Sequence, residues 1–241
     1  MKIAFFGAGN LLTALLGGCG GGGDNAASAT TFSFVMPKLN SQRIYNRTII
    51  DNSGNTIDET LSDTVTAVNA DGSYVVLAED PNHDSVTVNG TIYSIVTEAV
   101  SVNDSDQDTA YSYTAADGST TTCTYVPHGG GPDLPLTVGA TWTITYNFSC
   151  GANLPVAYTQ TGTVVDVESV TVPAGTYSAV KLQSTLTWTG PEGTTRTQSI
   201  TNWRDVNTLL SVKEDISTSY SGTMLINGYP VSTETLFYSQ P

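Results

Sequence analysis

The chain has 241 residues, and its eight basic and 22 acidic side chains give it a formal net charge of −14. Such a surface repels nucleic acid and anionic lipid head groups, so the charge balance excludes nucleic-acid binding as a function. Only 12% of the residues are charged, while threonine, serine, glycine and valine are abundant. This composition is typical of an exported β-protein rather than a cytosolic helical one.

The amino-terminal segment has the layout of a secretory signal peptide, with Lys2 as its positive charge and two apolar runs after it. It ends in Leu16-Gly17-Gly18-Cys19, and a run of glycines follows directly. These four residues resemble the lipobox of bacterial lipoprotein signal peptides. The resemblance implies that residues 1–18 are removed and that Cys19 becomes the lipid-bearing first residue.

The lipobox resemblance also implies that acyl chains on Cys19 hold the protein in a membrane. No later stretch approaches the roughly 18 apolar residues that a transmembrane helix needs, whereas two or more acyl chains anchor a protein firmly. Gly20 follows the cysteine, and in proteobacterial lipoproteins a residue other than aspartate at this place favours the outer membrane. We therefore expect residues 19–31 to form a lipidated, flexible tether and residues 32–241 to form a β-domain that faces the periplasm or the cell exterior.

Residues 1–10 also resemble the first strand and glycine turn of a dinucleotide-binding reductase. That fingerprint needs a third glycine close to position 12, where this chain has Leu12. It also needs an acidic residue about 20 positions further on, at the end of a second strand. The chain continues instead with a glycine run and a β-rich sequence, so the context favours a signal peptide and no cofactor is expected.

Downstream of the tether, the chain has the pattern of β-strands joined by tight turns. No ten-residue stretch shows helical spacing, and pairs of a polar residue with glycine separate the alternating runs. These pairs are Ser53-Gly54, Asp71-Gly72, Asn89-Gly90, Asp117-Gly118, Glu192-Gly193 and Asn227-Gly228. Links of this kind predict an all-β fold built as an antiparallel meander.

Two stretches, residues 141–148 and 180–188, alternate apolar and polar side chains, which predicts strands with one inward face. The apolar face that they form includes Trp142, Ile144, Tyr146, Leu182 and Trp188. Between the two stretches the alternation slips near Glu168-Ser169, which predicts a β-bulge or a bend. Long strands with bulges curl a sheet, so we expect a half-barrel or an open sandwich.

Two further segments carry a second resemblance. Residues 134–142 place a turn before a strand with a tryptophan, and residues 170–181 place a Pro-Ala-Gly turn inside a hairpin that leads into a strand with a tyrosine. This pair resembles segments common in bacterial periplasmic β-proteins and lipoproteins of unknown function. The resemblance implies a curved antiparallel sheet similar to the half-barrel carriers that move lipoproteins, and it carries over no catalytic residue.

The domain divides into two stretches of similar layout, residues 32–127 and 134–241. Each contains a long hairpin followed by a glycine turn into a strand with a tyrosine. An internal duplication would explain this likeness, and so would β-propensity alone. The glycine-rich stretch 128–133 lies between the two and is a candidate hinge.

The three cysteines fall into two roles. Cys19 is assigned to lipid, so Cys123 and Cys150 remain as an even pair in an oxidising compartment. We expect a disulfide between them, which in the chain-entropy model would add roughly 3–4 kcal/mol of stability. Two buried free thiols are the alternative.

An acidic stretch offers one candidate metal site. Asp104, Asp106 and Asp108 alternate as the first three ligands of a calcium loop do. The glycine expected next is Thr109, and Ala115 stands where the loop needs a glutamate. A solvated acidic turn is the better account, and calcium is the alternative.

The sequence contains no recognisable catalytic group. The two histidines lack the spacing of a zinc site, and a Gly-x-Ser-x-Gly nucleophile elbow is absent. Carboxylates on strands, such as Glu59 and Asp63, are expected on the solvent-exposed face of the sheet. Because no constellation puts a nucleophile beside a base, we expect a non-enzymatic protein without catalytic residues.

Two hypotheses about function follow from the apolar face. In the first, the face is open, and the protein is a membrane-anchored envelope lipoprotein that binds or carries an apolar or lipid-like ligand. In the second, the face is the core of two packed sheets. The protein would then be a structural or interaction lipoprotein that presents a threonine-rich surface and holds no small-molecule ligand.

Overall fold

The computed structural model describes residues 30–51, 54–79, 85–88, 91–115, 117–190, 195–220, 225–226 and 229–240. The predicted signal peptide, Cys19 and nearly all of the predicted tether lie outside the described residues. Within those ranges, no helix has the length and apolar character needed to cross a membrane.

The described elements are β-strands. In chain order they are β1 (Thr31–Phe32), β2 (Gln42–Asp51), β3 (Thr56–Val68), β4 (Tyr74–Glu79), β5 (Ser85–Val88), β6 (Thr91–Val102), β7 (Asp108–Ala115), β8 (Thr120–Val126), β9 (Leu136–Thr137), β10 (Thr141–Cys150), β11 (Val156–Val172), β12 (Gly175–Thr189), β13 (Thr195–Asp205), β14 (Ser211–Tyr220), β15 (Leu225–Ile226) and β16 (Tyr229–Gln240).

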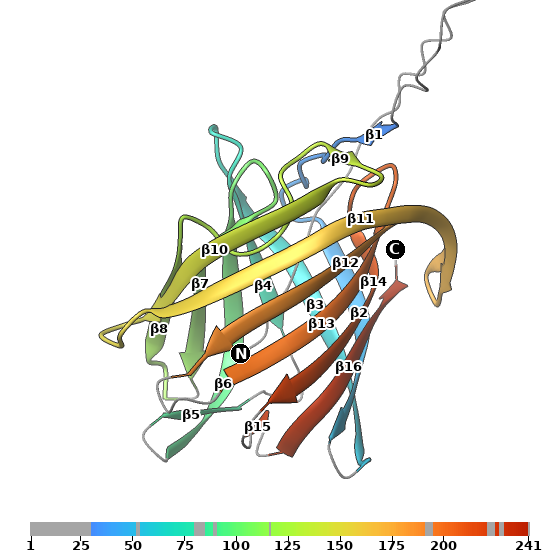
Figure 1. Ribbon diagram of the computed structural model, residues 1–241. Helices are drawn as coiled ribbons and strands as arrows, with labels where there is room; N and C mark the ends of the chain where they lie inside the picture. Colours follow the sequence, from blue (N-terminus) through green and yellow to red (C-terminus); the bar gives the residue numbers. More distant parts are fainter. Residues whose placement is uncertain are drawn as a thin grey trace, which may run out of the picture.

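The strands from β2 to β14, apart from the short β5 and β9, form one antiparallel meander in which neighbours in sequence are neighbours in the sheet. β16 pairs with β2 on one side and with residues 213–217 of β14 on the other. The sheet curls, and its two walls, β2–β8 and β10–β14, lie face to face (Figure 1). β1 and β9 form a separate small sheet. The prediction of an all-β antiparallel meander, curled as a half-barrel or open sandwich, is confirmed.

Burial along the strands follows the predicted alternation. In β10, Tyr146 and Phe148 are buried, while the threonines of the strand are exposed. β12 buries Leu182, Leu186 and Trp188 in the same way. The period of two therefore gave the correct inward face for both strands.

The curl of β11 starts at an irregularity that lies earlier than the sequence indicated. The pairing of β11 with β12 shifts register between Val164 and Asp166, and not at Glu168-Ser169. Val164 is buried and Val165 is 38% exposed, so Val165 is the extra, outward-turned residue of a bulge. Beyond this bulge the β11–β12 hairpin bends over at its end (Figure 1).

Aromatic rings form a row across the inner face of the second wall. Tyr146 lies directly opposite Tyr158, and Tyr158 lies opposite Trp188. The ring centroids are 5.3 Å apart in the first pair and 5.2 Å apart in the second, and both pairs are stacked. Tyr125 of β8 packs edge-on against Tyr146. These four residues, which we call the aromatic row, are all at most 8% exposed and belong to the core.

The predicted disulfide is confirmed. Cys123 and Cys150 lie opposite each other on β8 and β10, with Cα atoms 4.0 Å apart, and their sulfur atoms are bonded. Because β8 ends the first wall and β10 begins the second, the bridge stabilises the seam between the two walls.

The glycine-rich loop between β8 and β9 is packed into the interior, so the candidate hinge was wrong. The backbone N–H of Gly129 donates to the carbonyl oxygen of Asp108 at 2.6 Å. A Cβ atom on Gly130 would lie 1.7 Å from Oε1 of Gln160, so a larger residue there would displace the Gln160 side chain. Both halves of the domain contribute to one sheet; a duplication of the halves stays a prediction.

Candidate functional site

The five side chains predicted to form an apolar ligand face share the inner side of the second wall. Tyr146, Leu182 and Trp188 are 1%, 5% and 8% exposed, and Trp142 and Ile144 are half-buried. All five pack in the two hydrophobic core clusters. This packing favours a closed core over an open apolar face.

The interior also contains buried charges, which the sequence analysis missed. Arg204 of β13 forms an ion pair with Asp106, which lies between β6 and β7, with 2.7 Å between Nη1 and Oδ2. The hydroxyl of Tyr74 on β4 donates to Oδ1 of Asp106 at 2.5 Å. The side chains of Arg204 and Asp106 are 7% and 2% exposed. These bonds join the second wall to the first, so they stabilise the face-to-face arrangement.

Arg204 is held from its own wall as well. Its Nε donates to Oδ1 of Asn202 at 3.3 Å. The amide of Asn202 donates to Oε2 of Glu214 at 2.8 Å and to the Ser211 hydroxyl at 2.7 Å. We call Tyr74, Asp106, Asn202, Arg204, Ser211 and Glu214 the buried ionic cluster. Each charged member accepts or donates hydrogen bonds, as buried charges must.

A second buried ion pair corrects an expectation about β3. Glu59 and Asp63 were expected on the wet face of the sheet, yet they are only 6% and 4% exposed. Glu59 pairs with Arg47, which lies opposite it on β2 and is also buried. These two acidic residues therefore face inward, opposite Arg47 and Arg43 of β2, whereas Asp58 of the same strand is exposed.

The predicted calcium alternative does not fit the geometry. Asp104 is exposed, whereas Asp106 and Asp108 are buried. Both oxygens of Asp106 accept hydrogen bonds from protein side chains, Tyr74 and Arg204. Across the described ranges, no group of three or more histidine, cysteine or acidic side chains is arranged to hold a metal ion.

Burial changes the ionisation of the two aspartates beside Arg204. It raises the pKa of Asp106 to about 6, against the opposing effect of the Arg204 guanidinium. Burial and the neighbouring Asp106 raise the pKa of Asp108 well above its usual range. Burial, followed by the charge of Asp106, also raises the pKa of Tyr74. Asp106 and Asp108 therefore keep their protons at a pH at which exposed aspartates have lost them.

Because of these pKa shifts, the stability of the fold decreases as the pH rises. The folded pKa values lie above the unfolded value of 3.8, so the contribution of these two groups to stability is fully present below that value. It is lost as the pH rises through about 6 for Asp106 and higher for Asp108. We expect Asp108→Asn to flatten this fall and to be more stable than the wild type at pH 8.

Urea unfolding at pH 4.5, 6 and 8 measures this effect. The control is Asp104→Asn, which changes an exposed aspartate four positions away; its pH profile should match the wild type. An Asp108→Asn profile that also matches the wild type would contradict the prediction.

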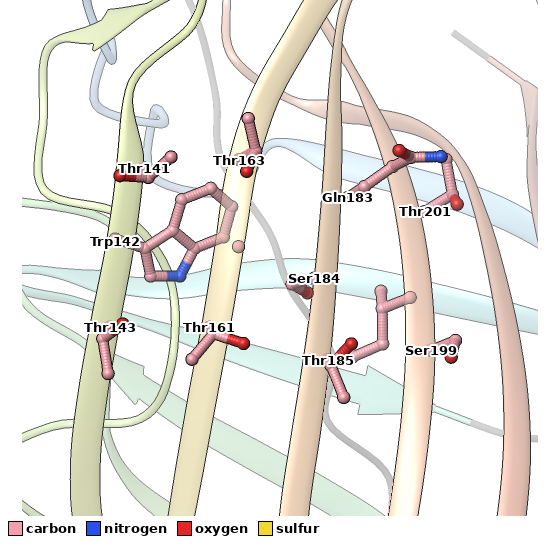
Figure 2. Close-up of a pocket in the computed structure, with 12 residues that line it drawn as sticks. Thr141, Trp142, Thr143, Thr161, Thr163, Gln183, Ser184, Thr185, Ser199 and Thr201 are labelled. Atoms are coloured by element: carbon pink, nitrogen blue, oxygen red, sulfur yellow. The ribbon is translucent and has the colours of Figure 1, made fainter.

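The outer face of the second wall carries a groove of about 510 Å³ that crosses β10, β11, β12 and β13. Two cross-strand rows of side chains border it. The first row is Thr141, Thr163, Gln183 and Thr201, and the second is Thr143, Thr161, Thr185 and Ser199. Figure 2 shows one row on each side of Trp142.

The floor of this groove is formed by Trp142, Gly162, Ser184 and Ile200, which lie in register between the two rows. The indole of Trp142 covers Gly162, where a Cβ atom would lie 2.2 Å from the ring. Because side chains alternate between the two faces of a strand, the side chains of the floor residues point inward. Their backbone atoms therefore line the groove. The twelve lining residues include no charged side chain.

The comparisons with known proteins show the fold alone. No protein-family model matches the chain, and no curated protein matches it. A crystal structure of a candidate exported protein with a YmcC-like fold from Bacteroides fragilis is similar, with a TM-score of 0.50 and 14% identity over 88% of this chain and 99% of that one. A candidate lipoprotein from Parabacteroides distasonis matches with a TM-score of 0.45 and 13% identity over 87% and 98% of the two chains.

Proposed function

We propose that this chain is a lipid-anchored protein of the bacterial envelope whose packed β-domain acts as an interaction surface, without catalysis. The observation that carries the proposal is the burial of the aromatic row, together with the hydroxyl-bearing side chains that the second wall turns outward. A domain with a filled interior and a polar exterior acts through its surface. The lipobox resemblance of residues 16–19 and the glycine after Cys19 support an anchor in the outer membrane.

A carrier of an apolar or lipid-like ligand is the weaker alternative. It requires an open inner face, but three of the five side chains predicted for that face are buried. Trp142 and Ile144 are the two half-buried ones. Trp142 packs against a cluster that includes Leu136 of β9, at the part of the wall that the small β1–β9 sheet covers.

A non-enzymatic role agrees with how the perturbed carboxyl groups are held. Raised pKa values often mark catalytic acids, but structural ion-pair networks raise them too. In the buried ionic cluster, Asp106 is bonded on both oxygens to Tyr74 and Arg204. Its shift is therefore explained by packing between the walls and needs no substrate.

The anchor is tested by replacing its lipid acceptor. Cys19→Ser should abolish labelling by radioactive palmitate and release the protein from the membrane fraction, because the thiol at the signal-peptide junction is lost. Ser28→Ala, a change in the tether, is the matched control and should keep the label. In the wild type, labelled protein should sediment with the outer membrane. Equal labelling of the wild type and Cys19→Ser would rule out the lipoprotein assignment.

A further inference from the structure

The second wall carries an uncharged array of hydroxyl groups that is wider than the groove itself. Two successive cross-strand rows are made only of threonine and serine. They are Thr143, Thr161, Thr185, Ser199 and Ser217, followed by Thr145, Thr159, Thr187, Thr197 and Ser219. Eight of these ten residues are exposed and two are half-buried. We call these ten residues the hydroxyl grid.

From this grid and its groove we infer a binding site for a neutral polysaccharide chain, an inference that rests on the proposed function of an interaction surface. The grid has no charged member and no large apolar side chain. It can therefore form no ion pair with an anionic polymer and little apolar contact with a lipid. A sugar presents hydroxyl groups that both donate and accept, as threonine and serine do. It also presents C–H faces, which suit the threonine methyl groups.

The geometry of the wall suits an extended polymer. Neighbouring strands of a sheet lie roughly 4.8 Å apart, and residues on one face repeat roughly every 6.7 Å along a strand. The hydroxyls therefore stand at regular intervals in two directions, and the groove runs across four strands. Sites repeated in this way bind a polymer more tightly than its monomer, because each further contact is intramolecular.

Most of these hydroxyls are available to a ligand. Within the described residues, the grid makes two side-chain hydrogen bonds. One joins the hydroxyls of Thr145 and Thr159 at 3.2 Å, and in the other the Ser219 hydroxyl donates to the Thr197 carbonyl at 3.4 Å. The hydroxyls that border the groove, among them those of Thr161 and Thr185, are not used in this way. The backbone beneath them is fixed by long paired strands, so binding orders few groups.

The hydroxyl grid is not only a result of β-propensity. Threonine is favoured in any strand, but the outer face of the first wall is mixed. There Thr60 alternates with the exposed carboxylate of Asp58 on β3, while the neighbouring strands present Ile50 and Glu79. On β6–β8 of the same wall, Thr97, Thr114 and Thr120 form one short row, but the rows beside it contain Ala99 and Ala110. Among the described residues, the hydroxyl rows that continue over five strands lie on the second wall.

The test is affinity electrophoresis of the purified lipoprotein in detergent, through native gels that contain dextran, mannan or hydroxyethyl cellulose, with alginate as an anionic polymer. At least one neutral polysaccharide should retard the wild type, and salt should not weaken the effect. Thr161→Val/Thr185→Val removes two hydroxyls and keeps the side-chain shape, and it should weaken retardation at least tenfold. Thr60→Val/Thr122→Val, a pair of exposed threonines outside the grid, is the matched control and should leave it unchanged.

Three results would overturn the inference: no retardation by any neutral polysaccharide, equal retardation of the grid and control variants, or retardation by alginate alone. Thermal melting of each variant shows that it is folded. If a valine variant were unfolded, Thr185→Ser, which keeps the hydroxyl, and Thr185→Ala, which removes it, would replace it as the pair. None of these results depends on palmitate labelling, so failure of the inference and failure of the anchor are distinguished.

Discussion

Replacing Arg204 by methionine should lower the free energy of unfolding at pH 8 by about 3–5 kcal/mol, because it leaves an ionised carboxylate buried without its cation. Arg204 and Asp106 are 7% and 2% exposed at the side chain and lie 2.7 Å apart. The loss should be smaller at pH 5, since Asp106, with its pKa already raised to about 6, can then take up a proton instead.

Urea denaturation at both pH values measures this difference. Lys213→Met is the matched control, because Lys213 also forms a 2.8 Å ion pair, with Asp215, but the two side chains are 25% and 39% exposed. Partly exposed pairs contribute about 0–1 kcal/mol. A loss for Arg204→Met no larger than for Lys213→Met, or one that is equal at pH 5 and pH 8, would show that the cluster does not hold the walls together.

The sequence was sufficient for those features that depend on neighbours along the chain or across one turn. Alternation identified the inward faces of β10 and β12, and glycine turns gave the meander. The disulfide followed from counting, because Cys123 and Cys150 were the two cysteines left after Cys19. Each of these features has a short-range signal, such as a period of two, a turn pair or an even number of thiols.

The buried ionic cluster had no such signal. Asp106 and Arg204 are 98 positions apart in sequence, and a charged residue on a strand is normally assigned to the wet face. The other buried ion pair, Arg47 with Glu59, did have a local hint in β2. There Arg43 and Arg47 alternate in phase with Tyr45 and Ile49, and Tyr45, Arg47 and Ile49 are all buried. Two arginines in phase with apolar residues indicate a partly ionic interior, provided that acidic partners lie on the next strand.

The glycine loop and the acidic turn were misinterpreted for the same reason. A run of glycines indicates flexibility when it is considered alone, but Gly129 and Gly130 are buried and the Gln160 side chain lies against Gly130. Alternating aspartates were interpreted as a solvated turn, with calcium as the alternative, but Asp106 is buried and faces Tyr74 and Arg204. In both cases the deciding contact comes from a strand that is distant in sequence.

The replacement of Trp188 by alanine separates the two hypotheses about the inner face. Trp188 is 8% exposed and stacks on Tyr158 at 5.2 Å, so the change removes a large ring from the packed core. We expect it to lower the free energy of unfolding by about 3–5 kcal/mol. Leu154→Ala is the control, because Leu154 is 86% exposed and its replacement should have almost no effect.

The same experiment is informative when a lipid-like probe is added. If the aromatic row is core, titration with palmitic acid should leave the tryptophan emission of the wild type unchanged, because no apolar chain can reach Trp188. If the row were an open ligand face, palmitic acid should shift the emission and Trp188→Ala should weaken binding while costing little stability. Trp142→Ala tests the half-buried end of the face, where a smaller loss of stability is expected. A saturable emission change that Trp142→Ala removes and Leu154→Ala keeps would favour the carrier hypothesis, whereas a large loss for Trp188→Ala without any lipid response favours a domain that acts through its outer surface.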